Sequence, residues 1–163
     1  MEAVTHTIAP VFDRESRVLL LGTMPSPKSR EAGFFYCHPQ NRMWKVLAGV
    51  FGEAEPVDIE ARREFLLSHH IAMWDVLSEC EIKGADDNSI RKPKANDLSV
   101  ILEHAPIKAI FTSGKKAFAL YNRHIRPVTG REAVCLPSTS PANCRYETLE
   151  TLIRAYGVLR DYI

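Results

Sequence analysis

Two short segments of the chain combine proline with hydroxyl side chains, a composition suited to contact with phosphates or polar base edges. The first of them is Gly22-Thr23-Met24-Pro25-Ser26-Pro27-Lys28-Ser29. Its glycine allows a tight turn, and its prolines stiffen a backbone whose amides and hydroxyls can bind anions. It is neither a P-loop nor a dinucleotide fingerprint, because GK[ST] and GxGxxG are both missing. The simpler alternative is a rigid turn at the end of a strand.

The second segment lies near the end of the chain and has the same character. It reads Leu136-Pro137-Ser138-Thr139-Ser140-Pro141-Ala142-Asn143. A helix is predicted to follow it, and helix N-terminal amides attract anions. Two stiff loops of this kind at one edge of a sheet would form a pincer for a phosphodiester backbone.

Aromatic and amide side chains lie between the two segments. Phe34, Phe35 and Tyr36 are adjacent and cannot all enter a core, so we expect one of them to line a crevice and stack on a nucleobase. His38 is either a catalytic group or a structural histidine of the loop. Asn41 stands at a predicted helix start, where it is either a functional amide or a helix cap.

Hydrophobic periodicity places these residues on an α/β framework. Apolar runs predict strands at 17–22, 71–76, 107–112 and 132–136, and the polar stretch 79–93 is expected to be a loop. Helices are predicted at 41–51, 58–68, 97–104, 113–122 and 145–162. This alternation predicts a three-layer α/β/α sandwich with a central, mostly parallel four-stranded sheet. Such sheets bind ligands outside the carboxyl ends of their strands, where both Ser/Pro segments fall.

Composition restricts the class of protein. The chain has 163 residues, of which 45% are hydrophobic, and it shows no linker or repeat, so we expect one domain spanning 1–163. No apolar run approaches the roughly 18–20 residues that span a bilayer, so no membrane association is expected. The first six residues lack the pattern of a signal peptide, which favours a cytoplasmic protein.

The cysteines give little sign of a metal site. They form no CxxC pair and match no common zinc spacing; they are Cys37, Cys80, Cys135 and Cys144. An iron–sulfur cluster would need all four thiolates from scattered positions, so free thiols in a reducing compartment are the simpler interpretation. We expect neither a metal nor an organic cofactor.

Three blocks together resemble the uracil-DNA glycosylase superfamily. They are the Gly22–Ser26 segment, the Pro137–Asn143 segment and His38-Pro39-Gln40-Asn41-Arg42-Met43-Trp44. The resemblance runs from about residue 18 to residue 162 and is greatest to the hypoxanthine-DNA glycosylase (DNA-deoxyinosine glycosylase) branch. It implies a monofunctional glycosylase of base-excision repair that flips out a deaminated base and hydrolyses its N-glycosidic bond. Hypoxanthine is favoured, with uracil or xanthine possible. A catalytically inactive α/β module that binds nucleic acid or nucleotides is the alternative.

The resemblance also implies roles for individual residues. Asn41 would be catalytic and orient the attacking water. Tyr36 would stack on the base, with Phe35 in reserve, while the Gly22–Ser26 loop reads the base edge. His38 would be a substitute for the histidine that many relatives use to steady the leaving base, a role that the resemblance itself does not give it. The residues expected to contact DNA are Lys28, Lys115, Lys116, Ser138, Thr139, Ser140, Pro141 and Asn143. Each lysine taken singly could equally be solvated surface.

Two departures from the family pattern bear on the chemistry. Met24 stands where uracil-removing relatives carry the Asp or Asn that positions water, and Leu136 stands where many carry a histidine. The oxocarbenium-like sugar can be stabilised by the DNA phosphates, so the protein must mainly expose the base, orient a water and hydrogen-bond the departing purine. Asparagine is a poor base, so slow turnover is expected. No lysine is placed for Schiff-base chemistry, so no strand-cleaving lyase step is expected.

The net charge of +1 conceals an uneven distribution. Segment 108–131 carries six basic residues and no acid, 28–45 carries four bases and one acid, and 46–90 carries ten acids and three bases. This pattern predicts a basic crevice face, an acidic back and salt-sensitive binding of DNA that contains a deaminated base. We expect the protein to act as a monomer.

Overall fold

Four short strands lie in parallel at the centre of the protein. The structure is a computed structural model that describes residues 1–163. The strand order is β3 (Ile71–Asp75), β2 (Val18–Gly22), β6 (Ala109–Ser113) and β7 (Ala133–Leu136), and every pairing is parallel. All residues of β2 and β3 are buried. Burial on both faces explains why these strands read as continuous apolar runs.

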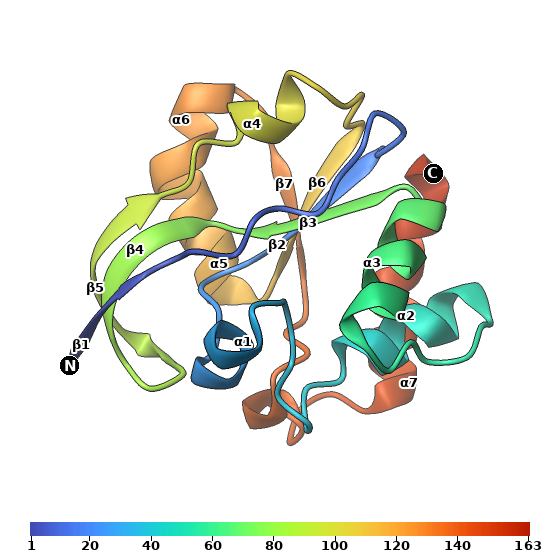
Figure 1. Ribbon diagram of the computed structural model, residues 1–163, viewed down its shortest axis with the longest axis horizontal. Helices are drawn as coiled ribbons and strands as arrows, with labels where there is room; N and C mark the ends of the chain where they lie inside the picture. The colour runs from blue at the N-terminus through green and yellow to red at the C-terminus, as the bar shows by residue number, and fades with distance from the viewer.

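Helices cover both faces of this sheet. Figure 1 shows α2 (Met43–Phe51), α3 (Ile59–Ser68) and α7 (Leu149–Tyr156) on one side, and α5 (Lys115–Leu120) with α6 (Arg126–Thr129) on the other. A π-helical turn, Tyr121–Ile125, joins α5 to α6, and a 3₁₀ segment, Gly157–Tyr162, extends α7. The predicted three-layer α/β/α architecture is confirmed. None of the helices has the length and apolar character that crossing a membrane requires.

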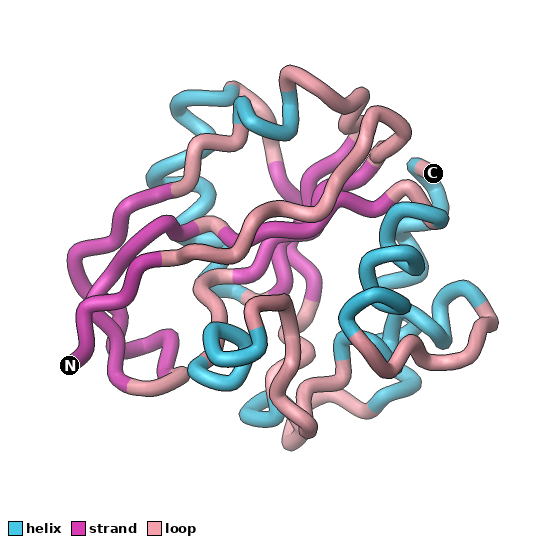
Figure 2. The backbone as a smooth tube through the Cα atoms, viewed as in Figure 1, coloured by secondary structure: helices cyan, strands magenta, loops and turns pink.

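The predicted loop at 79–93 is wrong, because this segment forms a hairpin. Strands β4 (Leu77–Lys83) and β5 (Asp86–Ala95) pair antiparallel, and β1 (Glu2–Thr5) adds to β4. Figure 2 shows the strands of this second sheet, in magenta, side by side at the left of the view near the N-terminus. The segment looked like a loop because only one face of β4 is buried and β5 is mostly polar. Val76 alone separates β3 from β4, so the hairpin begins at the carboxyl end of β3.

Several helices begin or end at residues other than the predicted ones, because capping residues fix their ends. An unpredicted helix, α1 (Pro27–Ala32), begins after Ser26, whose hydroxyl accepts a backbone N–H, and ends at Gly33 in the left-handed conformation. The last helix begins at Leu149 rather than at 145, because Thr148 caps it. The helix predicted at 97–104 shrinks to α4 (Ser99–Leu102), and a 3₁₀ turn forms at Pro141–Asn143.

Candidate active site

The loop that follows β2 keeps backbone donors unused. The N–H groups of Thr23, Met24 and Ser26 donate no hydrogen bond within the chain. The Ser26 hydroxyl, in contrast, is occupied as the N-cap of α1, and Pro25 is buried and has no N–H to give. This loop therefore offers amide donors, at the carboxyl edge of the parallel sheet, to a ligand that carries acceptors.

Gly22 ends β2 at a point where two side chains converge. A Cβ atom at Gly22 would lie 2.4 Å from Asp75 Oδ1 and 2.7 Å from Tyr36 Oη. The Tyr36 hydroxyl is buried without a partner, although the residue as a whole is only half-buried. Burial, with the Asp75 carboxylate nearby, raises the pKa of Tyr36 well above its ordinary value. Tyr36 therefore keeps its proton and has an inward-pointing hydroxyl.

A buried histidine–aspartate pair, absent from the predicted site residues, lies next to Gly22 and the Tyr36 hydroxyl. His6 Nε2 lies 2.8 Å from Asp75 Oδ2, and the two side chains are 1% and 5% exposed. The His6 Nδ1 atom accepts the Ile8 N–H at 3.2 Å, so the proton of the neutral ring resides on Nε2 and is donated to Asp75. The pair fixes the Asp75 carboxylate at the end of β3. No local sequence pattern predicts the His6–Asp75 pair, because 69 residues separate the partners.

The β4–β5 hairpin supplies a second unanticipated carboxylate, that of Asp87. This half-buried residue lies near Thr23, Asp75 and Lys116. Burial raises the pKa of the Asp87 carboxyl; the Thr23 hydroxyl and the Lys116 ammonium oppose this rise, whereas the neighbouring Asp75 adds to it. Asp87 was not among the predicted site residues, because the hairpin that carries it was expected to be a loop.

Asp87→Asn should make the protein more stable at neutral pH. Because the pKa of Asp87 is higher in the folded than in the unfolded chain, folding stability decreases as the pH rises from the unfolded pKa through the folded one. The amide has no such titration, so the free energy of unfolding of the variant should exceed that of the wild type above this window. Urea unfolding between about pH 3 and about pH 8 checks this, with the exposed Asp161→Asn as control. An equal or lower stability at neutral pH would contradict the expectation.

Asn41 precedes α2 and is held through one atom of its amide. Its Oδ1 accepts the Met43 N–H at 2.9 Å and the Thr139 hydroxyl at 2.9 Å. Its Nδ2 makes no hydrogen bond within the chain and is not among the fully buried unpartnered atoms. Arg42 and not Asn41 is the N-cap residue of α2, but Asn41 still stabilises the start of the helix by accepting its first N–H, and it also keeps an amide donor available.

Neighbouring contacts fasten the Asn41 region to the loop that follows β7. The Arg42 N–H donates to the Thr139 carbonyl at 3.1 Å, and Arg42 Nη1 donates to the Glu147 carbonyl at 2.6 Å. The two blocks that sequence analysis singled out, around Asn41 and around Thr139, are therefore in direct contact.

The loop after β7 is anchored from α7. Tyr156 Oη donates to the Pro137 carbonyl at 2.7 Å and accepts from Ser113 Oγ at 2.8 Å. Burial raises the pKa of Tyr156, so its hydroxyl stays protonated and able to donate. Ser113 ends β6, so this chain of hydrogen bonds ties the loop to the carboxyl edge of the sheet.

Within this loop the polar side chains mainly shape the backbone. Ser138 Oγ accepts the Ser140 N–H at 3.1 Å, Ser140 Oγ accepts a backbone N–H of the turn Pro141–Asn143, and Asn143 Nδ2 donates to the Ser138 carbonyl at 2.9 Å. The N–H groups of Ser138 and Thr139 donate to nothing within the chain. The loop is therefore rigid, and it presents backbone amides, whereas the buried Thr139 side chain faces Asn41.

The three adjacent aromatics divide as their crowding required. Phe34 and Phe35 are buried in the core with their rings 5.5 Å apart, and only Tyr36 keeps partial exposure. Phe35 is 2% exposed, so it has no free ring face for a base and the expectation for it does not hold. Tyr36, at a φ of 52°, remains the aromatic candidate. His38 is half-buried, and its Nδ1 accepts the Gln40 N–H at 3.1 Å.

The expected division into a basic face and an acidic back is wrong in part. Lys108 and Arg131 precede β6 and β7 and so lie at the amino edge of the sheet, where Arg131 donates to the Ile107 carbonyl. Asp75 and Asp87, from the acidic segment, lie instead at the candidate site. A run of residues that includes a whole strand crosses the molecule, so its charges cannot share one face. Three of the expected cations belong to segments at the carboxyl edge: Lys28, Lys115 and Lys116.

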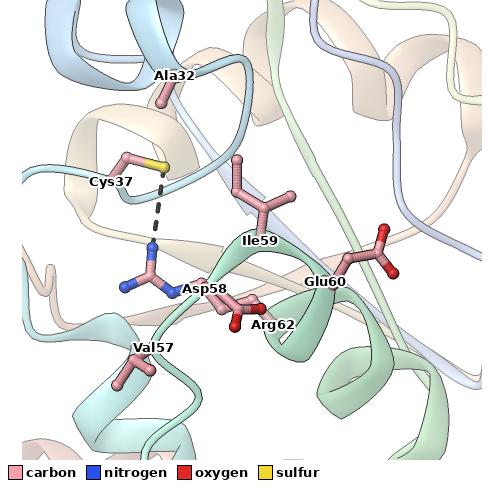
Figure 3. Close-up of a pocket in the computed structure, with 7 residues that line it drawn as sticks. All are labelled: Ala32, Cys37, Val57, Asp58, Ile59, Glu60 and Arg62. Atoms are coloured by element: carbon pink, nitrogen blue, oxygen red, sulfur yellow. Dashed lines mark hydrogen bonds between the residues drawn. The ribbon is translucent and has the colours of Figure 1, made fainter.

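Cys37, although it adjoins Tyr36 and His38, belongs to a separate hollow. Figure 3 shows this hollow between α1 and the start of α3, with Arg62 Nη1 lying 3.9 Å from Cys37 Sγ. Burial raises the pKa of the Cys37 thiol. No residue of the two Ser/Pro loops lines the hollow, so it is distinct from the candidate site.

Comparison with known proteins matches this chain to one family. The family model described as the uracil DNA glycosylase superfamily matches residues 9–159. Two proteins named hypoxanthine DNA glycosylase, from Methanosarcina barkeri and Methanosarcina acetivorans, are 32% and 31% identical over 138 residues; each match covers 83% of this chain and 86% of the relative.

A solved structure agrees with the family match. It is a solution NMR structure from Methanosarcina acetivorans whose name proposes a uracil DNA glycosylase. It superimposes with a TM-score of 0.79 at 27% identity, and the match covers 98% of this chain and 99% of that one. The chain belongs to the uracil DNA glycosylase superfamily and is a DNA glycosylase, a hydrolase of N-glycosyl bonds.

Proposed function

We propose that the protein removes deaminated bases from DNA, hypoxanthine above all, by hydrolysing the N-glycosidic bond of a flipped-out nucleotide. The observation that carries the proposal is the unused Asn41 amide donor, which Thr139 ties to the loop after β7 at the same carboxyl edge of the sheet as the free amides after β2. The two relatives named hypoxanthine DNA glycosylase support the choice of base.

The free amides of Thr23 and Met24 suit the edge that deamination creates. Adenine presents an amino group at C6, which is a donor, whereas hypoxanthine presents a carbonyl oxygen there. A backbone N–H can only donate, so it pairs with the carbonyl and leaves the amino group unmatched. Uracil and xanthine carry comparable carbonyls, which keeps them as candidate substrates. The ring of Tyr36, a half-buried residue whose hydroxyl points inward, is the proposed stacking face.

In the proposed mechanism Asn41 holds the attacking water, and the loop amides stabilise charge that develops on the departing base. The sugar becomes oxocarbenium-like as its bond to the base lengthens, and the neighbouring DNA phosphates stabilise that cation. Donors that are already oriented need no reorganisation when the charge appears. Extruding the base costs a few kcal/mol, and less at a mismatch, which favours a poorly paired deaminated base.

The proposed activity is tested by single-turnover release of free base at saturating enzyme. Duplex and single-stranded oligonucleotides carrying one inosine, uracil or xanthine serve as substrates, with adenine at the same position as control. We expect hypoxanthine to be released fastest, adenine to be retained, and the strand to remain uncut until alkali is added. Absence of release from every deaminated substrate would refute the proposed activity.

DNA binding by the site should weaken steeply with salt. Lys28 and Lys115 are exposed, Lys116 is half-buried, and all three flank the strand-end loops. Each phosphate contact that is neutralised contributes about −0.9 to the slope of log K against log salt. Lys28→Ala and Lys115→Ala should each make that slope shallower by about one. Lys108→Ala, at the opposite edge of the sheet, is the matched control and should leave it unchanged. Fluorescence anisotropy across a salt series measures all three slopes, and equal slopes would refute these contacts.

A further inference from the structure

Both acceptor positions of the Asn41 side-chain oxygen are already used. An amide oxygen carries two lone pairs, and Oδ1 accepts from the Met43 N–H and from Thr139 Oγ1, each at 2.9 Å. A backbone N–H can only donate, so the Asn41 atom that faces Met43 has to be the oxygen. The orientation of the amide is therefore fixed by its partners, and Nδ2 is the atom left for a ligand.

Thr139 is buried and contacts the Asn41 region through both its side chain and its backbone. It is 1% exposed, its hydroxyl donates to Asn41, and its carbonyl accepts the Arg42 N–H at 3.1 Å. The residue thus holds two consecutive positions, 41 and 42, from a loop 98 residues away in sequence. A hydroxyl so buried is poorly placed to reach a DNA phosphate, which was the role expected of it.

We propose that Thr139 is a positioning residue that locks the Asn41 amide with Nδ2 outward, so that Asn41 serves the glycosylase reaction as a hydrogen-bond donor only. The inference rests on the proposed function. Asn41 then orients the water without taking its proton, in contrast to a carboxylate, which would accept that proton.

The reaction balances without a base at this position. The water oxygen accepts the Asn41 Nδ2–H through one lone pair and uses the other to form the bond to C1′. The C1′–N9 bond breaks, and its electron pair leaves with the purine. The proton released by the water passes to solvent, and the departing purine takes up one proton from solvent. One water is consumed for each base released.

Asn41→Asp tests whether the reaction needs a hydrogen-bond donor or an acceptor at the position of Asn41 Nδ2. The carboxylate can still accept from Met43 and Thr139, so the local fold should persist, but it replaces the Nδ2 donor with an oxygen. We expect the single-turnover rate on inosine to fall about 10²- to 10³-fold, as far as with Asn41→Ala. Binding to an oligonucleotide with non-cleavable 2′-fluoro-deoxyinosine should change little. An N41D enzyme as active as the wild type would overturn the inference.

Thr139 variants test the lock itself. Thr139→Val should slow base release by about tenfold or more, because the Met43 N–H alone then holds the Asn41 oxygen and the amide can swing about that single hydrogen bond; Thr139→Ser should recover most of the rate. In an Asn41→Ala background Thr139→Val should cost nothing further, because the residue acts through Asn41. Thr112→Val is the matched control, since this buried hydroxyl has no partner, and its rate should equal that of the wild type.

The outcomes distinguish the inference from the proposed function. A wild-type protein that releases no base refutes the function itself. If the wild type releases hypoxanthine, two results would refute the positioning role of Thr139 and leave the function in place. One is a T139S variant as slow as T139V, and the other is additive losses of rate from N41A and T139V. Thermal unfolding of each variant confirms that the compared proteins are folded.

Discussion

Asn41→Ala should nearly abolish base release while the protein stays folded. The substitution removes the Nδ2 donor and the acceptor for Met43 and Thr139, and loss of one oriented donor costs enzymes about 10²- to 10³-fold in rate. The lost hydrogen bond at the start of α2 should cost about 1–2 kcal/mol of stability. The large effect on rate and the small effect on folding therefore separate the catalytic role from the cap.

Single-turnover release of hypoxanthine measures the rate, and urea unfolding measures the stability. Asn122→Ala provides the matched control, because this half-buried asparagine lies in the π-helical turn between α5 and α6, away from the strand-end loops. Its rate should stay within about twofold of the wild type, as expected for a substitution that removes no donor from the site. Full activity of the Asn41→Ala enzyme would refute the catalytic assignment, and an unfolded variant would show that the cap role dominates.

The parallel sheet could be predicted because its strands carry their own signal. Val18–Leu21 is apolar throughout because β2 is buried on both faces, and this pattern needs no knowledge of distant residues. The β4–β5 hairpin carried no comparable signal. Its strands bury one face at most, its register shifts repeatedly, and its polar residues look like those of a loop. Asp87 was missed together with the hairpin that carries it.

The contacts that define the site could not be predicted from local pattern. Asn41 was identified, but the meaning of its amide depends on Thr139, which belongs to another loop. His6 and Asp75 likewise meet only after β1 and β3 are in place. For Phe34, Phe35 and Tyr36, the sequence predicted that at least one aromatic side chain stays out of the core, but it did not indicate which one; Phe35 is buried. The prediction that a run of like charges forms one face failed for a topological reason. The residues before and after a strand lie at opposite edges of the sheet.

Gly22→Ala should damage both stability and activity. The new methyl group would lie 2.4 Å from Asp75 Oδ1 and 2.7 Å from Tyr36 Oη, far inside contact distance. Neither atom can yield easily: His6 holds the Asp75 carboxylate at 2.8 Å, and Tyr36 ends in a rigid ring whose hydroxyl is buried. Overpacking at such a site costs about 1–3 kcal/mol, and a displacement of about 1 Å in a positioned group can cost about 10²-fold in rate.

Gly157→Ala separates this clash from a general effect of replacing glycine. A Cβ there would meet only Arg160 Nη2, at an ordinary 3.6 Å, and the backbone is helical with a φ of −57°. This control should keep the wild-type rate and unfold within about 0.5 kcal/mol of it. Gly22→Ala enzyme with full activity and unchanged stability would mean that Asp75 and Tyr36 can move apart without consequence. In that case the end of β2 would not be the place where the base is read, and the free amides after Gly22 would need another ligand.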